Sequence, residues 1–363
     1  MTTRPTLITV SGTIPADVRD QVERGDRPRP DYLLLSERLR ADIADHGSLP
    51  DSGVGGLMRR AVGANVMLGW HCFRMRGRYD AIVTDGEQVG IPYAAFCRLA
   101  RRRPVHAMVV HILSVAKKVI VWRALRLVRR VDLLLVYCTR QREFAIERLR
   151  CDARQVALTT FMVDSNFFSP AAVEPKPRSR PMICSAGLEL RDYPTFIEAV
   201  RGLDIDVVIA AASPWSKRRD SSGAADVPDN VEICRLGFRD LRQLYADAAF
   251  VVMPLVDVEF QAGITTILEA MAMGKAVVCT RTRGQTDTLD DDVTGLYVPP
   301  GDVSRLRSAI LELIDDPARA ERLGEAARRW VVENADIDVY AARVADLVGA
   351  LDHEPRSRTT RGG

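Results

Sequence analysis

AFVVMPLVDVEFQAGITTILEAMAMGKAVVCT, residues 249–280, is the stretch that decides the fold of this chain. The valine-rich runs at residues 249–255 and 276–280 predict buried strands, and the segment between them predicts a short helix. This strand–loop–helix–strand order is the unit of a parallel sheet, and it places the loop at the carboxyl end of the first strand, where such sheets bind ligands. We therefore expect a doubly wound α/β fold with a binding loop before the helix.

The loop and the first turns of this helix carry the groups of an anion site. A helix leaves its first backbone N–H groups unpaired, and its dipole adds partial positive charge there. The N–H groups of Gly263, Ile264 and Thr265 therefore predict a phosphate site. Glu269, about one turn further along, is placed to accept hydrogen bonds from ribose hydroxyls. The hydroxyls of Thr265 and Thr266 either donate to the anion or cap the helix, and an ordinary crossover helix with a polar cap is the alternative.

The composition is that of a globular protein long enough for two domains. Of 363 residues, 47% are hydrophobic and 27% are charged. The formal net charge of +3 balances 51 basic against 48 acidic residues, which argues against a nucleic-acid-binding protein. The 7 scattered cysteines, without CxxC spacing, indicate neither disulfides nor a zinc site. We expect a cytoplasmic protein, because the N-terminus lacks the apolar core of a signal peptide and no run is long enough to span a membrane.

Alternating apolar runs and helical segments predict two such domains. In residues 1–168 the runs are LITVSG, DYLLL, DAIVTDG, HAMVVHI, VDLLLVYC and QVALTTF, which predict buried parallel strands. A proline-rich linker follows at residues 169–181. Residues 182–336 repeat the alternation and predict a second doubly wound domain. We expect a helix at residues 337–352 to pack back on the first domain and residues 353–363 to be disordered.

An ordered series of short motifs covers residues 163–330. They are Met162, Val163 and Asp164 with Phe168, Ser169 and Pro170; Ser185, Ala186 and Gly187 with Arg191; Leu236 and Gly237 followed by LRQLYADAAFVVMP; LEAMAMGKAVV at residues 268–278; and DDVTGLYVPPGD at residues 291–302. This series resembles the donor-binding half of the retaining GT-B glycosyltransferases of family 4 (group 1). The resemblance implies two Rossmann-like doubly wound domains that face each other across a cleft. It also implies retaining transfer of a sugar from a nucleotide-diphosphate sugar, without a metal or another cofactor.

The resemblance implies donor-side roles for several residues. Arg191 follows the loop at Gly187 and stands where the family carries a cation that meets the charge of the leaving diphosphate. Lys217 and Arg218 are second candidates for this role, with a solvated basic turn as their alternative. Glu269 aligns with the family's ribose-binding acid.

Gln261 departs from the family pattern. It stands eight residues before Glu269, where many members carry a second acid. Its amide hydrogen-bonds sugar hydroxyls but supplies no negative charge, and Glu259 would supply that charge if the loop bulged. We assign Gln261, together with Arg191 and His111, to the catalytic centre.

The first half resembles the family in outline only. The segment YDAIVTDGEQVGIPYAAFCRLARRRPVHAMVVH places Asp85, Gly86 and Glu87 at the end of one strand and His111 at the end of the next. His111 is a candidate for contact with the sugar or the diphosphate, and Glu87 is a candidate acceptor contact or base. Gly12, in VSGTIP, stands where the family carries a pair of glycines. We place Gly12, Asp85, Gly86 and Glu87 on the acceptor side, with a saccharide, a lipid-linked molecule or a small metabolite as acceptor.

Residues 114–130, SVAKKVIVWRALRLVRR, predict a basic amphipathic helix with Trp122 in its apolar stripe. Such a helix either packs its stripe on the sheet or makes weak peripheral contact with the inner face of a membrane.

Two other functions fit the same residues. A GT-B protein that binds nucleotide sugars with little or no transfer would account for Gln261 and the missing glycine pair, and a nucleotide-sugar epimerase shares the fold. An oxidoreductase is disfavoured, because no GxGxxG follows the first strand.

Overall fold

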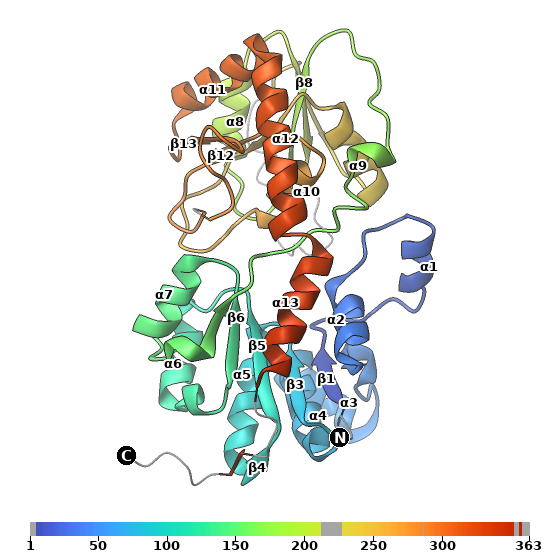
Figure 1. Cartoon of the computed structure of the whole chain (residues 1–363), viewed down its shortest axis with the longest axis vertical. Coiled ribbons are helices and arrows are strands. Elements are labelled where there is room, and N and C mark those ends of the chain that lie inside the picture. Colours follow the sequence, from blue (N-terminus) through green and yellow to red (C-terminus); the bar gives the residue numbers. More distant parts are fainter. Residues whose placement is uncertain (1–4, 212–226, 286, 352–355, 358–363) are drawn as a thin grey trace. The chain divides into compact units, whose positions relative to one another are not determined.

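The computed structural model describes residues 5–211, 227–285, 287–351 and 356–357. The chain divides into two compact units, each built on one six-stranded sheet (Figure 1). Unit 1 comprises residues 1–19, 30–160 and 340–363, and unit 2 comprises residues 20–29 and 161–339.

The division before residue 161 lies upstream of the predicted boundary at residue 168. The reason is local pairing within unit 2. The backbone N–H of Val163 donates to the carbonyl of Ala335 at 2.9 Å, and that of Ile337 donates to the carbonyl of Val163 at 2.9 Å. Residues 161–168 are therefore tied to the end of unit 2.

The sheet of unit 1 is parallel throughout, with the strand order β2-β1-β3-β5-β6-β7. Its central strands are buried along their whole length, as expected for apolar runs covered on both faces. The strands are β1 Thr6–Thr9, β2 Ala41–Ala44, β3 Ala81–Thr84, β5 Val105–Val110, β6 Leu133–Val136 and β7 Val156–Leu158. A separate short strand, β4 Arg102–Arg103, pairs antiparallel with β14 Arg356–Ser357, so this part of the tail that we expected to be disordered forms a strand.

The helices of unit 1 cover both faces of its sheet. Two further helices belong partly to unit 1 and partly to unit 2. Those that belong to unit 1 alone are α2 Asp31–Leu39, α3 Gly53–Val62, α4 Ala64–Met75, α5 Glu87–Phe96, α6 Ala116–Ala124 and α7 Thr139–Glu147, with 3-10 turns η1 His46–Ser48, η2 Arg76–Arg78, η3 Cys97–Leu99, η4 Leu127–Arg129 and η5 Ala153–Gln155. The shared helices are α1 Val18–Glu23, which enters unit 2 at Asp20, and α13 Ile337–Gly349, which belongs to unit 1 from Tyr340 onward.

One predicted strand of unit 1 is a helix. The run DYLLL opens α2, because leucine favours helices, and Tyr32, Leu33, Leu34 and Leu35 are buried within this helical segment. Arg40 ends the helix with a left-handed φ of 49°. The strand that follows, β2, lies at the sheet edge and is only partly buried, which explains its weak apolar signal.

The predicted helix at residues 114–130 is interrupted. It consists of α6 and η4, separated by a left-handed Arg126 with a φ of 47°. Trp122 and Leu127 are buried in a core cluster with residues of β5 and β6, so the apolar stripe packs on the sheet as a crossover helix does. No helix in the described part of the chain is long and apolar enough to cross a membrane.

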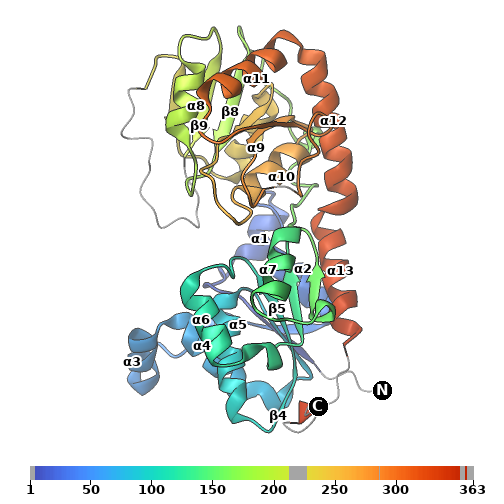
Figure 2. The same ribbon diagram turned by 90° about the vertical axis from the view of Figure 1, so that its left-hand side faces the viewer.

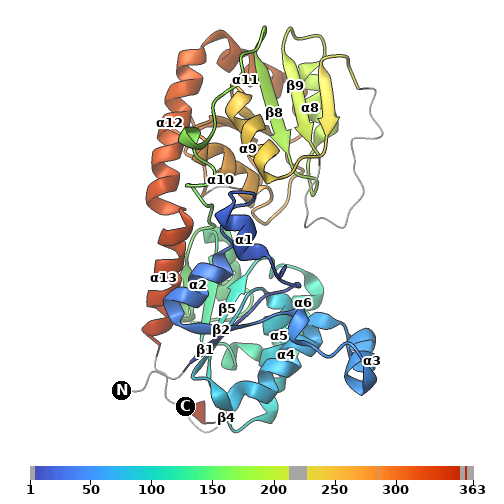
Figure 3. The same cartoon turned by 90° about the vertical axis from the view of Figure 1, so that its right-hand side faces the viewer.

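The sheet of unit 2 is also parallel, with the doubly wound order β10-β9-β8-β11-β12-β13. Its strands are β8 Met182–Ala186, β9 Asp206–Ala210, β10 Val231–Cys234, β11 Val251–Met253, β12 Val277–Thr280 and β13 Leu296–Val298. Helices cover both of its faces (Figures 2 and 3). They are α8 Tyr193–Val200, α9 Phe238–Asp247, α10 Ile264–Ala272, α11 Val303–Asp315 and α12 Pro317–Asn334, with the turn η6 Pro170–Ala172.

Two hydrophobic cores hold these layers together. Residues of α9, α10 and the end of α12 form one core, and residues of α8, α11 and the start of α12 form the other. This packing fixes the carboxyl ends of β8 and β11, from which the loops of the candidate site emerge.

Candidate functional site

The loop after β11 presents the N-terminus of α10. Gly263 precedes the helix with a left-handed φ of 76°, and a Cβ there would lie 3.0 Å from the sulfur of Met253. The backbone conformation therefore favours glycine, and a larger residue would be tight against Met253. Within the described ranges no side chain caps the helix, so neither Thr265 nor Thr266 acts as its N-cap. The first N–H groups of α10 are left for a ligand.

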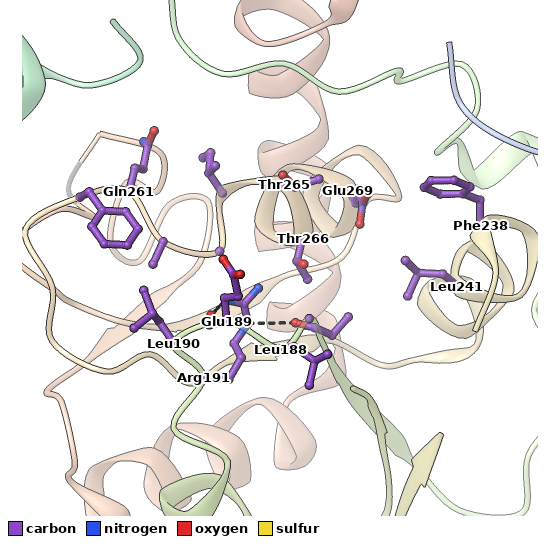
Figure 4. A pocket seen from close by; sticks show the side chains of 16 residues that line it. Leu188, Glu189, Leu190, Arg191, Phe238, Leu241, Gln261, Thr265, Thr266 and Glu269 are labelled. Carbon is purple, nitrogen blue, oxygen red and sulfur yellow. Dashed lines mark hydrogen bonds between the residues drawn. The ribbon is translucent and has the colours of Figure 1, made fainter. Parts of the chain in front are cut away.

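This helix terminus opens into a pocket of about 280 Å³ that lies entirely within unit 2. The walls come from the end of β8 and the loop after it, the first turn of α9, the loop at residues 260–263 and the first turns of α10 (Figure 4). The pocket brings together most of the residues predicted for the donor side: Gly187, Arg191, Gln261, Gly263, Ile264, Thr265, Thr266 and Glu269. Lys217 and Arg218 lie outside the described residues.

Arg191 is a buried cation, with 8% of its surface exposed. Its Nε donates to the carbonyl of Ala186 at 3.0 Å, and its Nη1 donates to the carbonyl of Glu189 at 2.8 Å. No carboxylate among the described residues forms an ion pair with it, and burial lowers the pKa of the guanidinium. Gly187, with a φ of 96°, leaves room for it, because a Cβ there would lie 2.4 Å from Nη2. A cation held in this way favours an anionic ligand.

Glu269 lines the pocket and is buried, with 6% of its surface exposed. Burial raises the pKa of its carboxyl to about 8, although a hydrogen bond from Tyr245 and the charge of Arg191 both act to lower it. At neutral pH the unliganded side chain is therefore mostly protonated. Tyr245 was not among the predicted site residues, and its only sequence signal was its place in LRQLYADAAF.

Gln261 is held by its amide nitrogen. Its Nε2 donates to Oγ1 of Thr288 at 2.8 Å, and its buried Oε1 has no hydrogen-bond partner among the described residues. Glu259 does not replace the missing acid, because it pairs with Arg283 at 2.8 Å and is absent from the pocket wall.

Three predicted acceptor-side residues, Asp85, Gly86 and Glu87, follow β3 in unit 1, and His111 follows β5. Nε2 of His111 lies 3.3 Å from Oδ1 of Asp85. A Cβ on Gly86, which has a φ of 93°, would lie 3.3 Å from the ring of His111. Burial disfavours the charged ring, but the hydrogen bond to Asp85 and the charges of Asp85, Glu87 and Asp31 outweigh it and raise the pKa of His111 to about 9.

Glu87 is enclosed by partners. Its side chain is fully buried and accepts hydrogen bonds from the backbone N–H of His111 at 2.9 Å, the backbone N–H of Ile112 at 3.2 Å and Nζ of Lys118 at 2.6 Å. This geometry makes Glu87 a support for the His111 loop, in place of the acceptor contact or base that we expected. Gly12 lies in the loop after β1, where its carbonyl accepts from the backbone N–H of His46 at 2.8 Å.

Asp31, the first residue of α2, is a charged neighbour that the sequence did not indicate. Burial and the charge of Asp85 raise the pKa of Asp31 to about 7. Its connection with His111 depends on the order of strands in the sheet, which brings distant segments of the chain to one edge.

Comparison with known protein families finds one similar segment, which lies in unit 2. Residues 189–316 match the family model of the group 1 glycosyl transferases. This segment is therefore similar to the group 1 glycosyl transferases. The matched segment contains Arg191, Gln261 and Glu269, and therefore most of the pocket described above.

Curated relatives resemble parts of the chain. A GDP-mannose-dependent monoacylated alpha-(1-6)-phosphatidylinositol monomannoside mannosyltransferase from Corynebacterium glutamicum is 33% identical over 141 residues, which is 37% of this chain and 35% of that protein. The matches to mycobacterial GDP-mannose-dependent mannosyltransferases are shorter, at 21% to 22% of the length of those proteins. The chain thus matches about a fifth to a third of the length of these relatives.

Solved structures match nearly the whole chain. Sucrose-phosphate synthase from Thermosynechococcus elongatus superposes with a TM-score of 0.72 at 18% identity, over 95% of this chain and 98% of that one. Anabaena HepE, solved in complex with UDP-glucose, gives a TM-score of 0.70 at 14% identity, over 96% of this chain and 100% of that one. The expected α/β fold of GT-B type, with two Rossmann-like doubly wound domains, is confirmed.

Proposed function

We propose that this chain is a glycosyltransferase that moves a hexose from a nucleotide-diphosphate sugar to an acceptor hydroxyl. The observation that carries the proposal is the pocket of unit 2, where an uncapped helix N-terminus, the buried cation of Arg191 and the buried carboxyl of Glu269 line one cavity. These groups match a diphosphate and a ribose. Phe238 and Leu241, which lie on the side of Glu269 away from Gln261, offer apolar surface to the base (Figure 4).

The reaction follows from where charge develops. As the bond between the anomeric carbon and the diphosphate oxygen breaks, negative charge grows on the departing diphosphate. Arg191 and the N–H groups of α10 meet that charge inside a partly enclosed site, where fixed dipoles and charges are most effective. In this proposal no metal ion or other cofactor is needed. The acceptor oxygen forms the new bond to the anomeric carbon and gives its proton to the departing diphosphate, and the anomeric configuration is retained.

The proposal is tested by incubating the purified protein with UDP-glucose or GDP-mannose and measuring release of the nucleoside diphosphate. Each donor is assayed alone and with saccharide or phosphatidylinositol mannoside acceptors. We expect one donor to be consumed, faster with an acceptor and with a glycosylated product. Tight binding of a donor without consumption would instead support a nucleotide-sugar-binding protein, as the amide at Gln261 allows. Interconversion of the free donor with its epimer would support an epimerase.

A further inference from the structure

A chain of hydrogen bonds behind the pocket fixes the orientation of Gln261. Gln285, fully buried, donates from Nε2 to the carbonyl of Ala262 at 3.2 Å. Oγ1 of Thr288 donates to Oε1 of Gln285 at 3.3 Å. The same hydroxyl accepts from Nε2 of Gln261 at 2.8 Å. The three side chains therefore form one connected series that begins at a backbone carbonyl and ends at Gln261.

The chemistry of these groups gives the series a single direction. A carbonyl oxygen only accepts, so Gln285 must turn its NH2 group toward Ala262 and its oxygen toward Thr288. The hydroxyl of Thr288 has one proton, and it donates this proton in the hydrogen bond to Oε1 of Gln285. Thr288 has only a lone pair left for Gln261, which must therefore present its NH2 group. The amide oxygen of Gln261 is the free end of the series, and it is a buried acceptor without a partner among the described residues.

We propose that Thr288 and Gln285 are positioning residues that make Gln261 an obligate hydrogen-bond acceptor for a hydroxyl of the donor sugar. This inference rests on the proposed function, because the ligand is the nucleotide sugar that the function requires. Gln261 lines the same pocket as Arg191 and Glu269. Its unpaired oxygen, which is costly to bury, gains a partner when a sugar hydroxyl arrives.

The same series disfavours an ionised carboxylate at this position. A glutamate at position 261 would turn a carboxylate oxygen toward Oγ1 of Thr288. The hydroxyl proton of Thr288 is already engaged in the hydrogen bond to Gln285. Two acceptors would then face each other at hydrogen-bond distance. If Thr288 turned its proton to the glutamate, the oxygen of Gln285 would lose its donor inside the protein. The amide at Gln261 is thus matched to its neighbours.

The first test compares Thr288→Val, which removes the hydroxyl with little change of shape, with Thr282→Val. Thr282 is a matched control, because its buried hydroxyl oxygen has no hydrogen-bond partner among the described residues. Calorimetry measures the affinity of each variant for UDP-glucose, GDP-mannose, UDP and GDP. We expect Thr288→Val to weaken binding of the preferred nucleotide sugar by about two- to tenfold, the range of one hydrogen bond. Binding of the nucleoside diphosphate, which lacks the sugar, should not change.

Thr282→Val should change neither affinity, and Thr288→Ser, which keeps the hydroxyl, should bind as the wild type does. An equal loss of affinity for nucleotide sugar and nucleoside diphosphate in Thr288→Val would overturn the proposal, because that pattern belongs to a general structural role. If Thr288→Val does not fold, Thr288→Ala is measured in its place with the same expected result.

The second test is a double-mutant cycle. Gln261→Glu should weaken nucleotide-sugar binding in the wild-type background and weaken it less in the Thr288→Val background, since the opposing acceptor is gone. In the Thr282→Val background the full loss should remain. The same loss in all three backgrounds would overturn the positioning role of Thr288 while leaving the proposed function intact. A wild-type protein that binds no nucleotide sugar would overturn the proposed function as well.

Discussion

The hydroxyl of Tyr245 lies 2.9 Å from Oε2 of Glu269 and donates a hydrogen bond to it inside unit 2. Both side chains are buried, and burial raises the pKa of Glu269 to about 8. Hydrogen bonds donated to a carboxylate favour its ionised form, so ribose hydroxyls that bind Glu269 would lower its pKa again. We therefore expect ligand binding in this pocket to be coupled to loss of a proton from Glu269.

We expect binding of a nucleotide sugar at pH 7 to release protons. The proton comes from Glu269, since the free protein holds it protonated and the complex holds it ionised. Affinity should consequently increase as the pH rises toward about 8. Titration calorimetry in two buffers of different ionisation enthalpy measures the protons released. Glu269→Gln should bind more weakly and release none, and equal proton release by wild type and variant would exclude Glu269 as the source.

Glu269→Gln should also change how stability depends on pH. The folded-state pKa of about 8 lies above the ordinary glutamate pKa of 4.5, so the folded state holds this proton more tightly than the unfolded chain. Ionisation therefore destabilises the fold progressively as the pH rises from about 4.5 through 8. The variant lacks this penalty, and its unfolding free energy relative to wild type should improve between pH 6 and pH 9. Urea unfolding at pH 6 and pH 9 measures the difference in unfolding free energy between variant and wild type. A difference that does not vary with pH would show that the pKa of Glu269 is not raised in the folded state.

Arg191→Ala should lower kcat by a larger factor than it raises KM. The loss of kcat should be about 10²- to 10³-fold, typical of removing one group that stabilises transition-state charge. Arg191→Lys keeps the charge but cannot hold both the Ala186 and Glu189 carbonyls, and it should retain part of the activity. Steady-state kinetics separate the two effects. If only KM rises, Arg191 contributes equally to ground-state and transition-state binding.

Lys118→Met should reduce the unfolding free energy of the protein by about 3–5 kcal/mol, because it leaves the fully buried carboxylate of Glu87 without its cation. Lys117→Met is the matched control, since the neighbouring Lys117 is exposed and should contribute little. Urea denaturation compares the two. Similar stability losses in both variants would show that the pairing with Glu87 does not stabilise the fold.

Asp85→Asn should lower the pKa of His111 from about 9 toward its ordinary value of 6.5. A histidine whose folded-state pKa is raised contributes stability that is fully present below about pH 6.5 and is lost as the pH rises through about 9. That loss should be smaller in the variant. NMR titration of the imidazole protons measures the pKa directly, and an unchanged value would mean that Asp85 does not hold the charge of His111.

Local sequence patterns predicted most of unit 2. The helix at α10 begins where Gly263 and the unpaired N–H groups predicted, because both signals are local. Glu269 and Arg191 were placed in one site by the order of motifs along the chain. The partners of these side chains were not predicted. Tyr245 lies on α9, and Thr288 and Gln285 lie in the loop after β12. Their contacts form only when these segments pack together, and neither spacing nor composition records such contacts.

Two sequence-based predictions for unit 1 differ from the structure, each for its own physical reason. DYLLL was predicted as a strand because a short apolar run has no periodicity that separates a buried strand from a buried helix. Glu87 was predicted to face a ligand because it follows a strand. In the structure it is buried and paired with Lys118, which lies 31 positions later in the chain. Its pairing depends on how α6 crosses the sheet, and that crossing is a property of the tertiary structure.

Titration calorimetry of the 363-residue chain with GDP-mannose and UDP-glucose tests the central claim most directly. We predict that one of these two nucleotide sugars binds with one molecule per chain and that the matching nucleoside diphosphate displaces it. Arg191→Ala should weaken the binding of this nucleotide sugar and of its nucleoside diphosphate. Absence of binding by either nucleotide sugar, or binding unaffected by Arg191→Ala in a folded protein, would contradict the claim that the pocket of unit 2 is a nucleotide-sugar site.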